Sequence, residues 1–138
     1  MDDTNKSCLI EINLVENKMK IGAMSIIRTA YRNELAEFRA ARASGDHASA
    51  WQRLERGHII AQGSLQLHIH SHGVMLAFAV SRREWAEVAG QVLRLFLAPL
   101  GTLTGRTPMG NTGRSDVSAF ATMPIPADIA QIVNAGRD

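Results

Sequence analysis

Residues 44–80 read SGDHASAWQRLERGHIIAQGSLQLHIHSHGVMLAFAV, and this stretch decides the fold. Ser44-Gly45-Asp46 predicts the end of one helix and the cap of the next, because glycine permits a tight turn and an aspartate accepts from free helical amides. The capped helix covers about 47–62. Gly63-Ser64 ends it, and a third, strongly apolar helix is predicted over about 65–80.

Two further helices flank this stretch. The first, at about 26–43, places apolar side chains at spacings of three and four on one side of a helix: Ile27, Tyr31, Leu35 and Phe38. The fourth, at about 82–98, opens on a Ser81/Glu84 capping box and ends before Pro99. It carries one apolar stripe that we predict to face the core: Trp85, Val88, Ala89, Val92 and Phe96.

The short loops between these helices make consecutive helices antiparallel neighbours. We therefore predict an all-α fold of two packed antiparallel helical hairpins, followed by an irregular strap over 99–126 and a short final helix over 127–135. Trp51 and Trp85 are 34 residues apart, which is the period of tetratricopeptide repeats, but agreement elsewhere is poor. The four-helix body is thus expected to be only weakly tetratricopeptide-like.

Composition indicates one globular domain. The chain has 138 residues, of which 46% are hydrophobic and 20% charged, enough apolar surface for a single core. The net charge of +2 argues against a nucleic-acid binder, which needs many clustered phosphate contacts. The longest apolar run, about Val74 to Val80, is far shorter than the ~20 residues of a membrane span. We expect a soluble protein with no nucleic acid and no membrane as partner.

The N-terminal residues differ in character from the rest. The single cysteine, Cys8, excludes an internal disulfide, and no secretion signal is readable, so a cytoplasmic location is expected. All three lysines precede Met24 and all twelve arginines follow it. Residues 1–23 are therefore interpreted as an extension, either a short strand or arm or a translated leader, and residues 24–138 as one helical domain.

Several polar side chains fall on faces that helical periodicity predicts to be buried. Glu55, His58 and Gln62 lie in the middle of the apolar face of the second helix. His68 and His72 are one turn apart on the third helix, and Glu34 lies at the edge of the apolar face of the first. Because a buried unpaired carboxylate costs several kcal/mol, these groups need partners.

One hypothesis is a metal site. Glu-x-x-His is a helical spacing used in metal-binding bundles, and imidazoles at i and i+4 can chelate one ion. We predict one divalent transition metal, Zn, Fe, Mn or Cu, with Gln62 orienting an imidazole and with these ligands: Glu34, Glu55, His58, His68 and His72. The alternative is a metal-free polar network in which Glu55 pairs with an arginine or a histidine, and the histidines bond to one another, to Gln62 or to water.

The glycine-rich strap contains a repeated element, since Thr104-Gly105-Arg106 recurs as Thr112-Gly113-Arg114. Backbone amides of such turns, together with Arg106, Asn111 and Arg114, could contact an anion or a carboxylate of a partner. The favoured interpretation is structural: a strap that covers the helical pairs through Val117, Phe120 and Met123.

Two segments carry a family resemblance: LERGHIIAQ at 54–62, and a tail from LAPLG at 97–101 through GNTGR at 110–114 to SAF at 118–120 and MPIP at 123–126. They resemble the bacterial domain-of-unknown-function family 3703 over about 25–126. The resemblance implies a short helical protein that starts near Met24 and is linked to heavy-metal handling. It also implies a pattern of polar residues at 55, 58, 62, 68 and 72.

Three functions remain open from the sequence. The first is a small metal-binding protein. The second is a helical interaction module that docks another protein or a second copy and holds no metal. The third is a small metalloenzyme with water at an open coordination position. Catalysis is the less favoured, because no nucleophile with an adjacent base can be recognised.

Overall fold

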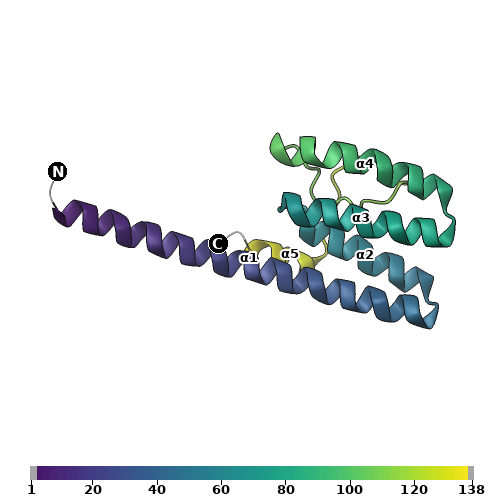
Figure 1. The fold of residues 1–138 in the computed structure, drawn as a ribbon, viewed down its shortest axis with the longest axis horizontal. Helices are drawn as coiled ribbons and strands as arrows, with labels where there is room; N and C mark the ends of the chain where they lie inside the picture. Colours follow the sequence, from purple (N-terminus) through teal and green to yellow (C-terminus); the bar gives the residue numbers. More distant parts are fainter. Residues whose placement is uncertain (1–2, 137–138) are drawn as a thin grey trace.

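The computed structural model describes residues 3–136, without the side chains of residues 3–9 and Thr102. Within this range it consists of five α-helices and contains no β-strand (Figure 1). The helices are α1 (Asp3–Ser44), α2 (His47–Ala61), α3 (Leu65–Arg82), α4 (Trp85–Leu103) and α5 (Ala127–Ala135). The predicted all-α class is confirmed. None of these helices is both long and apolar enough to cross a membrane.

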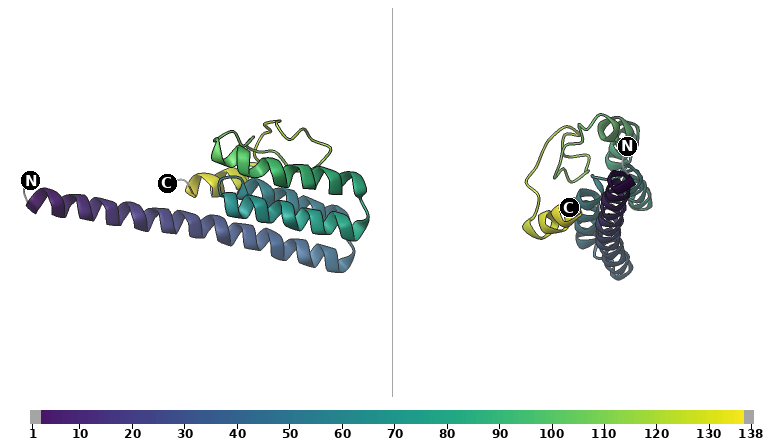
Figure 2. Two further views of the ribbon diagram at one scale, coloured as in Figure 1. Left: turned by 45° about the horizontal axis from the view of Figure 1, so that its top comes forward. Right: turned by 90° about the vertical axis from the view of Figure 1, so that its left-hand side faces the viewer.

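The helices form two antiparallel hairpins. α1 packs on α2, α3 packs on α4, and the α2–α3 contact joins the two pairs (Figure 1). An irregular strap follows α4 and leads to α5, which packs against α1 and α2 (Figure 2). Two hairpins, a strap and a short final helix are what the sequence predicts. The two tryptophans differ in environment, however, because Trp51 is buried and Trp85 is exposed, so the two hairpins are not equivalent repeats.

The helix boundaries follow local chemistry. Gly45 adopts a φ of 80°, and the Asp46 carboxylate caps α2 by accepting from the Ser49 amide at 3.0 Å. The predicted capping box at the start of α4 is wrong. Ser81 lies inside α3, where its hydroxyl donates to the Phe78 carbonyl, and Glu84 accepts from the Trp51 indole at 3.1 Å.

α1 reaches much further toward the N-terminus than predicted, and residues 3–23 belong to it as helix rather than strand. This part projects beyond the bundle, and the side chains of residues 10–22 are exposed (Figure 1). A helix satisfies its own backbone hydrogen bonds and therefore needs no neighbouring strand. A domain start near Met24 stays a prediction.

α4 also departs from the prediction at its end and in its orientation. It continues through Pro99 to Leu103. The φ of proline is compatible with a helix, although proline cannot donate the backbone hydrogen bond of that position. Burial of the neighbouring Ala98 helps to hold this part of the helix in place. Of the five residues predicted to face the core, only Val88 packs against it, and the other four are exposed, Trp85 to 65% and Phe96 to 74%. The buried side of α4 carries the polar residues Glu87, Gln91 and Arg94.

The core is centred on Phe78 of α3. Its ring lies edge-on to Phe38 of α1, with ring centroids 5.2 Å apart, and 5.0 Å from the ring of Trp51 on α2. These contacts tie three helices together at one point, because aromatic pairs at such distances add to the free energy gained by burial. Ile129 of α5 belongs to the same core.

We expect Phe78→Ala to lower the free energy of unfolding by about 3–5 kcal/mol, since it opens a cavity where three helices meet. Phe78 is 1% exposed and Phe120 is 78% exposed. The matched control, Phe120→Ala, should change stability by no more than about 0.5 kcal/mol. Urea unfolding followed by circular dichroism measures both, and similar effects for the two variants would contradict this core.

Candidate metal centre

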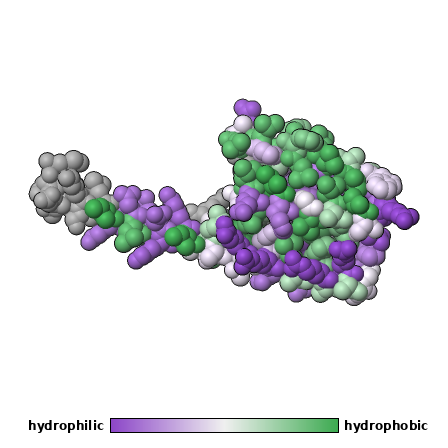
Figure 3. All heavy atoms as spheres, viewed as in Figure 1, coloured by the Kyte–Doolittle hydropathy of each residue, from purple (hydrophilic) through white to green (hydrophobic). Residues whose placement is uncertain are grey.

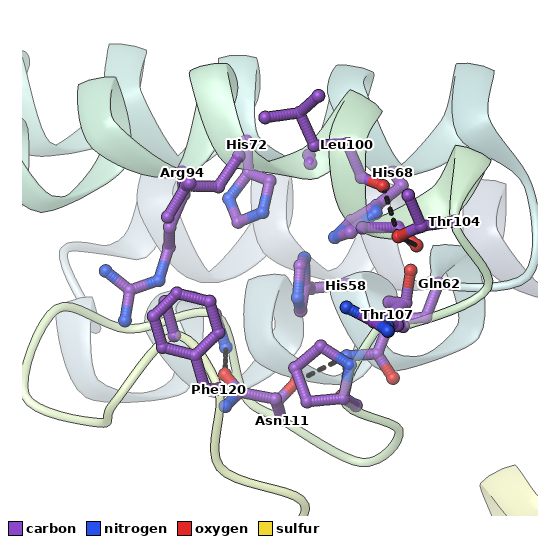
Figure 4. A pocket seen from close by; sticks show the side chains of 17 residues that line it. His58, Gln62, His68, His72, Arg94, Leu100, Thr104, Thr107, Asn111 and Phe120 are labelled. Atoms are coloured by element: carbon purple, nitrogen blue, oxygen red, sulfur yellow. Dashed lines mark hydrogen bonds between the residues drawn. The ribbon is translucent and has the colours of Figure 1, made fainter.

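Three histidines converge between α2 and α3. His58 comes from α2, and His68 and His72 lie one turn apart on α3. One ring nitrogen from each lies within 4.8 Å of the other two, and the ring centroids are 4.5–5.0 Å apart (Figure 4). All three are buried. The structure thus brings together three of the five residues that the sequence singled out as metal ligands.

Hydrogen bonding assigns the tautomer of His58. The Ser71 hydroxyl donates its one hydrogen to the His68 carbonyl at 2.7 Å. It must therefore act as acceptor toward Nδ1 of His58, which lies 3.0 Å away. A proton on Nδ1 leaves the lone pair on Nε2 of His58, which is the electronic state of a metal ligand.

A second network assigns the tautomer of His72. The amide nitrogen of Gln91 donates to Oε1 of Glu87 at 2.7 Å and to the Gly113 carbonyl at 2.8 Å. The amide oxygen is thereby directed at Nδ1 of His72, 2.8 Å away, and an oxygen can only accept there. His72 thus also carries its proton on Nδ1 and its lone pair on Nε2.

The electrostatic surroundings keep all three rings neutral near pH 7. Burial lowers the pKa of His68 and of His72 from 6.5 to about 4, with His72 acting further on His68. Burial also lowers the pKa of His58 well below 6.5, and the neighbouring histidines and Arg94 add to this effect. A neutral imidazole carries one unprotonated ring nitrogen, which is the form in which histidine can coordinate a cation.

A cavity of about 390 Å³ adjoins the three histidines and lies between α4 and the strap (Figure 4). Leu97, Leu100 and Phe120 contribute apolar wall, while Arg94 and Arg106 contribute charge. Gly113 forms the wall beside His58 with a φ of 81°. A Cβ at this position would lie 2.8–3.0 Å from three atoms of the His58 ring, so the strap reaches the histidine only with glycine here.

The two predicted carboxylate ligands lie elsewhere, in ion pairs with arginines. Glu34 accepts from Nε of Arg56 at 2.9 Å and from Arg53 at 3.3 Å. Glu55 pairs with Arg114 at 3.4 Å, and burial raises the pKa of Glu55 against the influence of that arginine. Arginines thus supply the partners that the buried Glu34 and the half-buried Glu55 require.

Gln62 binds the strap and not an imidazole. Its amide nitrogen donates to the carbonyls of Pro108 and Asn111, both at 3.1 Å, and its oxygen accepts from the Gly110 amide at 2.9 Å. Asn111 in turn donates to the Ser118 and Ala121 carbonyls at 2.8 and 2.7 Å. The strap is therefore held by buried amides, and Phe120, predicted to cover the helices, is exposed.

The two arginines of the repeated strap element differ. The guanidinium of Arg114 lies 3.9 Å from the centre of the Trp51 ring, and it also pairs with Glu87 at 3.2 Å. Its carboxylate contacts are therefore made within its own chain, whereas the sequence suggested an anion or a carboxylate of a partner. Arg106 is exposed at the cavity.

Burial alone would raise the pKa of Glu87, but hydrogen bonds from Ser115 and Gln91 and the charge of Arg114 lower this pKa overall.

Sequence reasoning missed Ser71 and Gln91, which orient His58 and His72. A signal for Gln91 was present, because Glu87, Gln91 and Arg94 recur at spacings of four and three in an otherwise apolar helix. Such spacing marks a polar face that is either solvated or buried against partners. Ser71 had no comparable signal, since serine inside a helix usually bonds its own backbone.

The fold and the site together define a small helical bundle with a buried three-histidine centre. The chain belongs to the family described as a protein of unknown function (DUF3703), whose model matches residues 25–133. No curated protein matches the chain. No solved structure matches it.

We predict that the metal-free protein loses stability as the pH falls from about 6.5 to about 4. In this window the unfolded chain protonates His68 and His72 while the folded chain does not, so protons favour unfolding. Urea unfolding at several pH values with a chelator present measures the slope. The double variant His68→Gln/His72→Gln should show a shallower slope, and equal slopes would contradict burial of neutral rings.

Proposed function

We propose that the protein binds one divalent transition metal ion through His58, His68 and His72. The observation that carries this proposal is the convergence of three buried neutral imidazoles, two of which have Nδ1 committed to fixed acceptors. A hydrogen-bonded network without metal does not require His58 and His72 to carry their protons on the same ring nitrogen. Metal-ligating histidines usually direct the other ring nitrogen to a side-chain or backbone acceptor in this manner.

The spacing of the rings fits an ion after a small adjustment. With metal–nitrogen bonds of about 2.0–2.1 Å, two nitrogens on one ion lie at most about 4.2 Å apart. The ring nitrogens lie within 4.8 Å of one another, so small rotations of the side chains bring them to this distance. Because the site offers imidazole and no carboxylate, Zn, Cu or Fe suits it better than Mn, which prefers oxygen ligands.

A metalloenzyme is the second candidate. Three histidines form the ligand set of some catalytic zinc sites, in which a metal ion activates water at a fourth position. The observation that favours this candidate is the cavity beside the histidines, which has room for a small substrate. Handling of a heavy metal, without catalysis, is the simpler role for the same ligand set.

Titration of the metal-free protein with Zn²⁺ or Co²⁺ tests the proposal. We expect one ion per chain, and loss of at least about a hundredfold in affinity in His58→Gln and His72→Gln, since each removes one of three ligands. His70→Gln is the matched control, because His70 is exposed on α3 and its Nδ1 contacts the Tyr31 hydroxyl instead. Absence of binding at micromolar metal, or equal affinity in all variants, would sink the proposal.

The residue that orients His72 gives an independent test. Gln91→Leu should weaken metal affinity by about 10–100-fold while all three ligands remain, which is the usual cost of removing such a partner. Gln62→Leu is the matched control, because Gln62 is equally buried but its hydrogen bonds go to the strap. Isothermal titration calorimetry compares the two, and a larger loss in Gln62→Leu would contradict the role of Gln91.

A further inference from the structure

We infer that the outer face of α4 is the interface of a homodimer, in which α4 of one chain packs on α4 of a second copy. This face, called the α4 face below, consists of Trp85, Val92, Leu93, Phe96, Leu100 and Leu103. Their exposed fractions range from 41% to 75%. Apolar residues gather over α4 at the upper edge of the molecule in the space-filling view (Figure 3). The inference does not depend on metal binding.

The outward orientation of this face is enforced by the buried side of α4. Gln91 donates to the Gly113 carbonyl, and Arg94 donates to the carbonyls of Arg114 and Val117. Glu87 accepts from the Ser115 hydroxyl at 2.6 Å. Rotating α4 to hide its apolar side would break these bonds and leave buried polar groups unsatisfied. The exposed apolar surface is thus a fixed property of the fold.

The spacing along α4 fits a second helix of the same kind. Five members of the α4 face, at 85, 92, 96, 100 and 103, form together with Ala89 a series with intervals of three and four, which is the spacing of the seam between two packed helices. A two-fold axis sets the same surface against itself, so no separate complementary partner is needed. No charged residue lies among the members of the α4 face, so two copies meet without repulsion.

The exposed area also matches what a dimer requires. With about 150–250 Å² for each aromatic side chain and roughly 60–120 Å² for each Val or Leu, the exposed fractions give the α4 face roughly 350–650 Å² of apolar surface. The largest apolar patch on an ordinary monomer covers roughly 300–600 Å². Each partner in a standard stable interface contributes about 800 Å². The α4 face therefore reaches the upper end of what monomers expose, and it supplies the greater part of the surface that one partner of a standard interface contributes.

Sedimentation velocity of the full chain tests the inference. The protein concentration is varied between about 1 and 100 µM, a range that covers the dissociation constants of moderately stable complexes. We expect a dimer for the wild type and a monomer for Leu93→Asp/Phe96→Asp, with at least a hundredfold weaker association. Circular dichroism should show an unchanged helix signal. If the aspartates prevent folding, Leu93→Ser/Phe96→Ser serves the same purpose.

The matched control uses a second exposed apolar helix surface, on α1. Ile10 and Ile21 on the projecting part of α1 are 67% and 69% exposed. Ile10→Asp/Ile21→Asp should therefore leave the dimer intact. A wild type that stays monomeric at 100 µM, or a dimer lost in the α1 variant and retained in the α4 variants, would overturn the inference.

Discussion

The side chain of Gln91 is completely buried, and a buried amide must satisfy both its oxygen and its nitrogen. Its oxygen bonds to His72 of α3, and its nitrogen donates to the Gly113 carbonyl of the strap and to Glu87 one turn back on α4. Gln91 thereby joins α4 to two other parts of the molecule, α3 and the strap. These bonds set the rotation of α4 about its axis. The tautomer of His72, the path of the strap and the exposure of the apolar side of α4 all follow from that rotation.

The strap is a structural part of the site. Gly110 and Gly113 have positive φ, and a Cβ at Gly110 would lie 1.9 Å from the Met123 carbonyl oxygen, so the strap folds closely on itself. Gln62 and Asn111 hold this fold by hydrogen bonds to backbone carbonyls. Since these bonds place Gly113 against His58, the strap forms one wall of the cavity beside the histidines. The strap, whose sequence shows no helical periodicity, is therefore held in one defined position.

The ion pairs decide the chemistry available at the histidines. Glu34 joins α1 to Arg56 of α2, and Arg56 also reaches Asp128 of α5, so this carboxylate serves the packing of three helices. Arg114 similarly neutralises Glu55 and Glu87. With its carboxylates engaged in this way, the centre is left with nitrogen donors alone. That donor set favours borderline metals over those that prefer oxygen.

The sequence by itself determined the helix breaks at Gly45 and Gly63 and the one-turn spacing of His68 and His72, because backbone conformation and helical periodicity are local properties. It also marked His58 as a polar residue on an apolar face. Only the tertiary structure decided that Glu55 pairs with Arg114, 59 residues away, and that the polar side of α4 faces inward. Those outcomes depend on which distant groups satisfy a buried charge or amide, and helical periodicity carries no information about such partners.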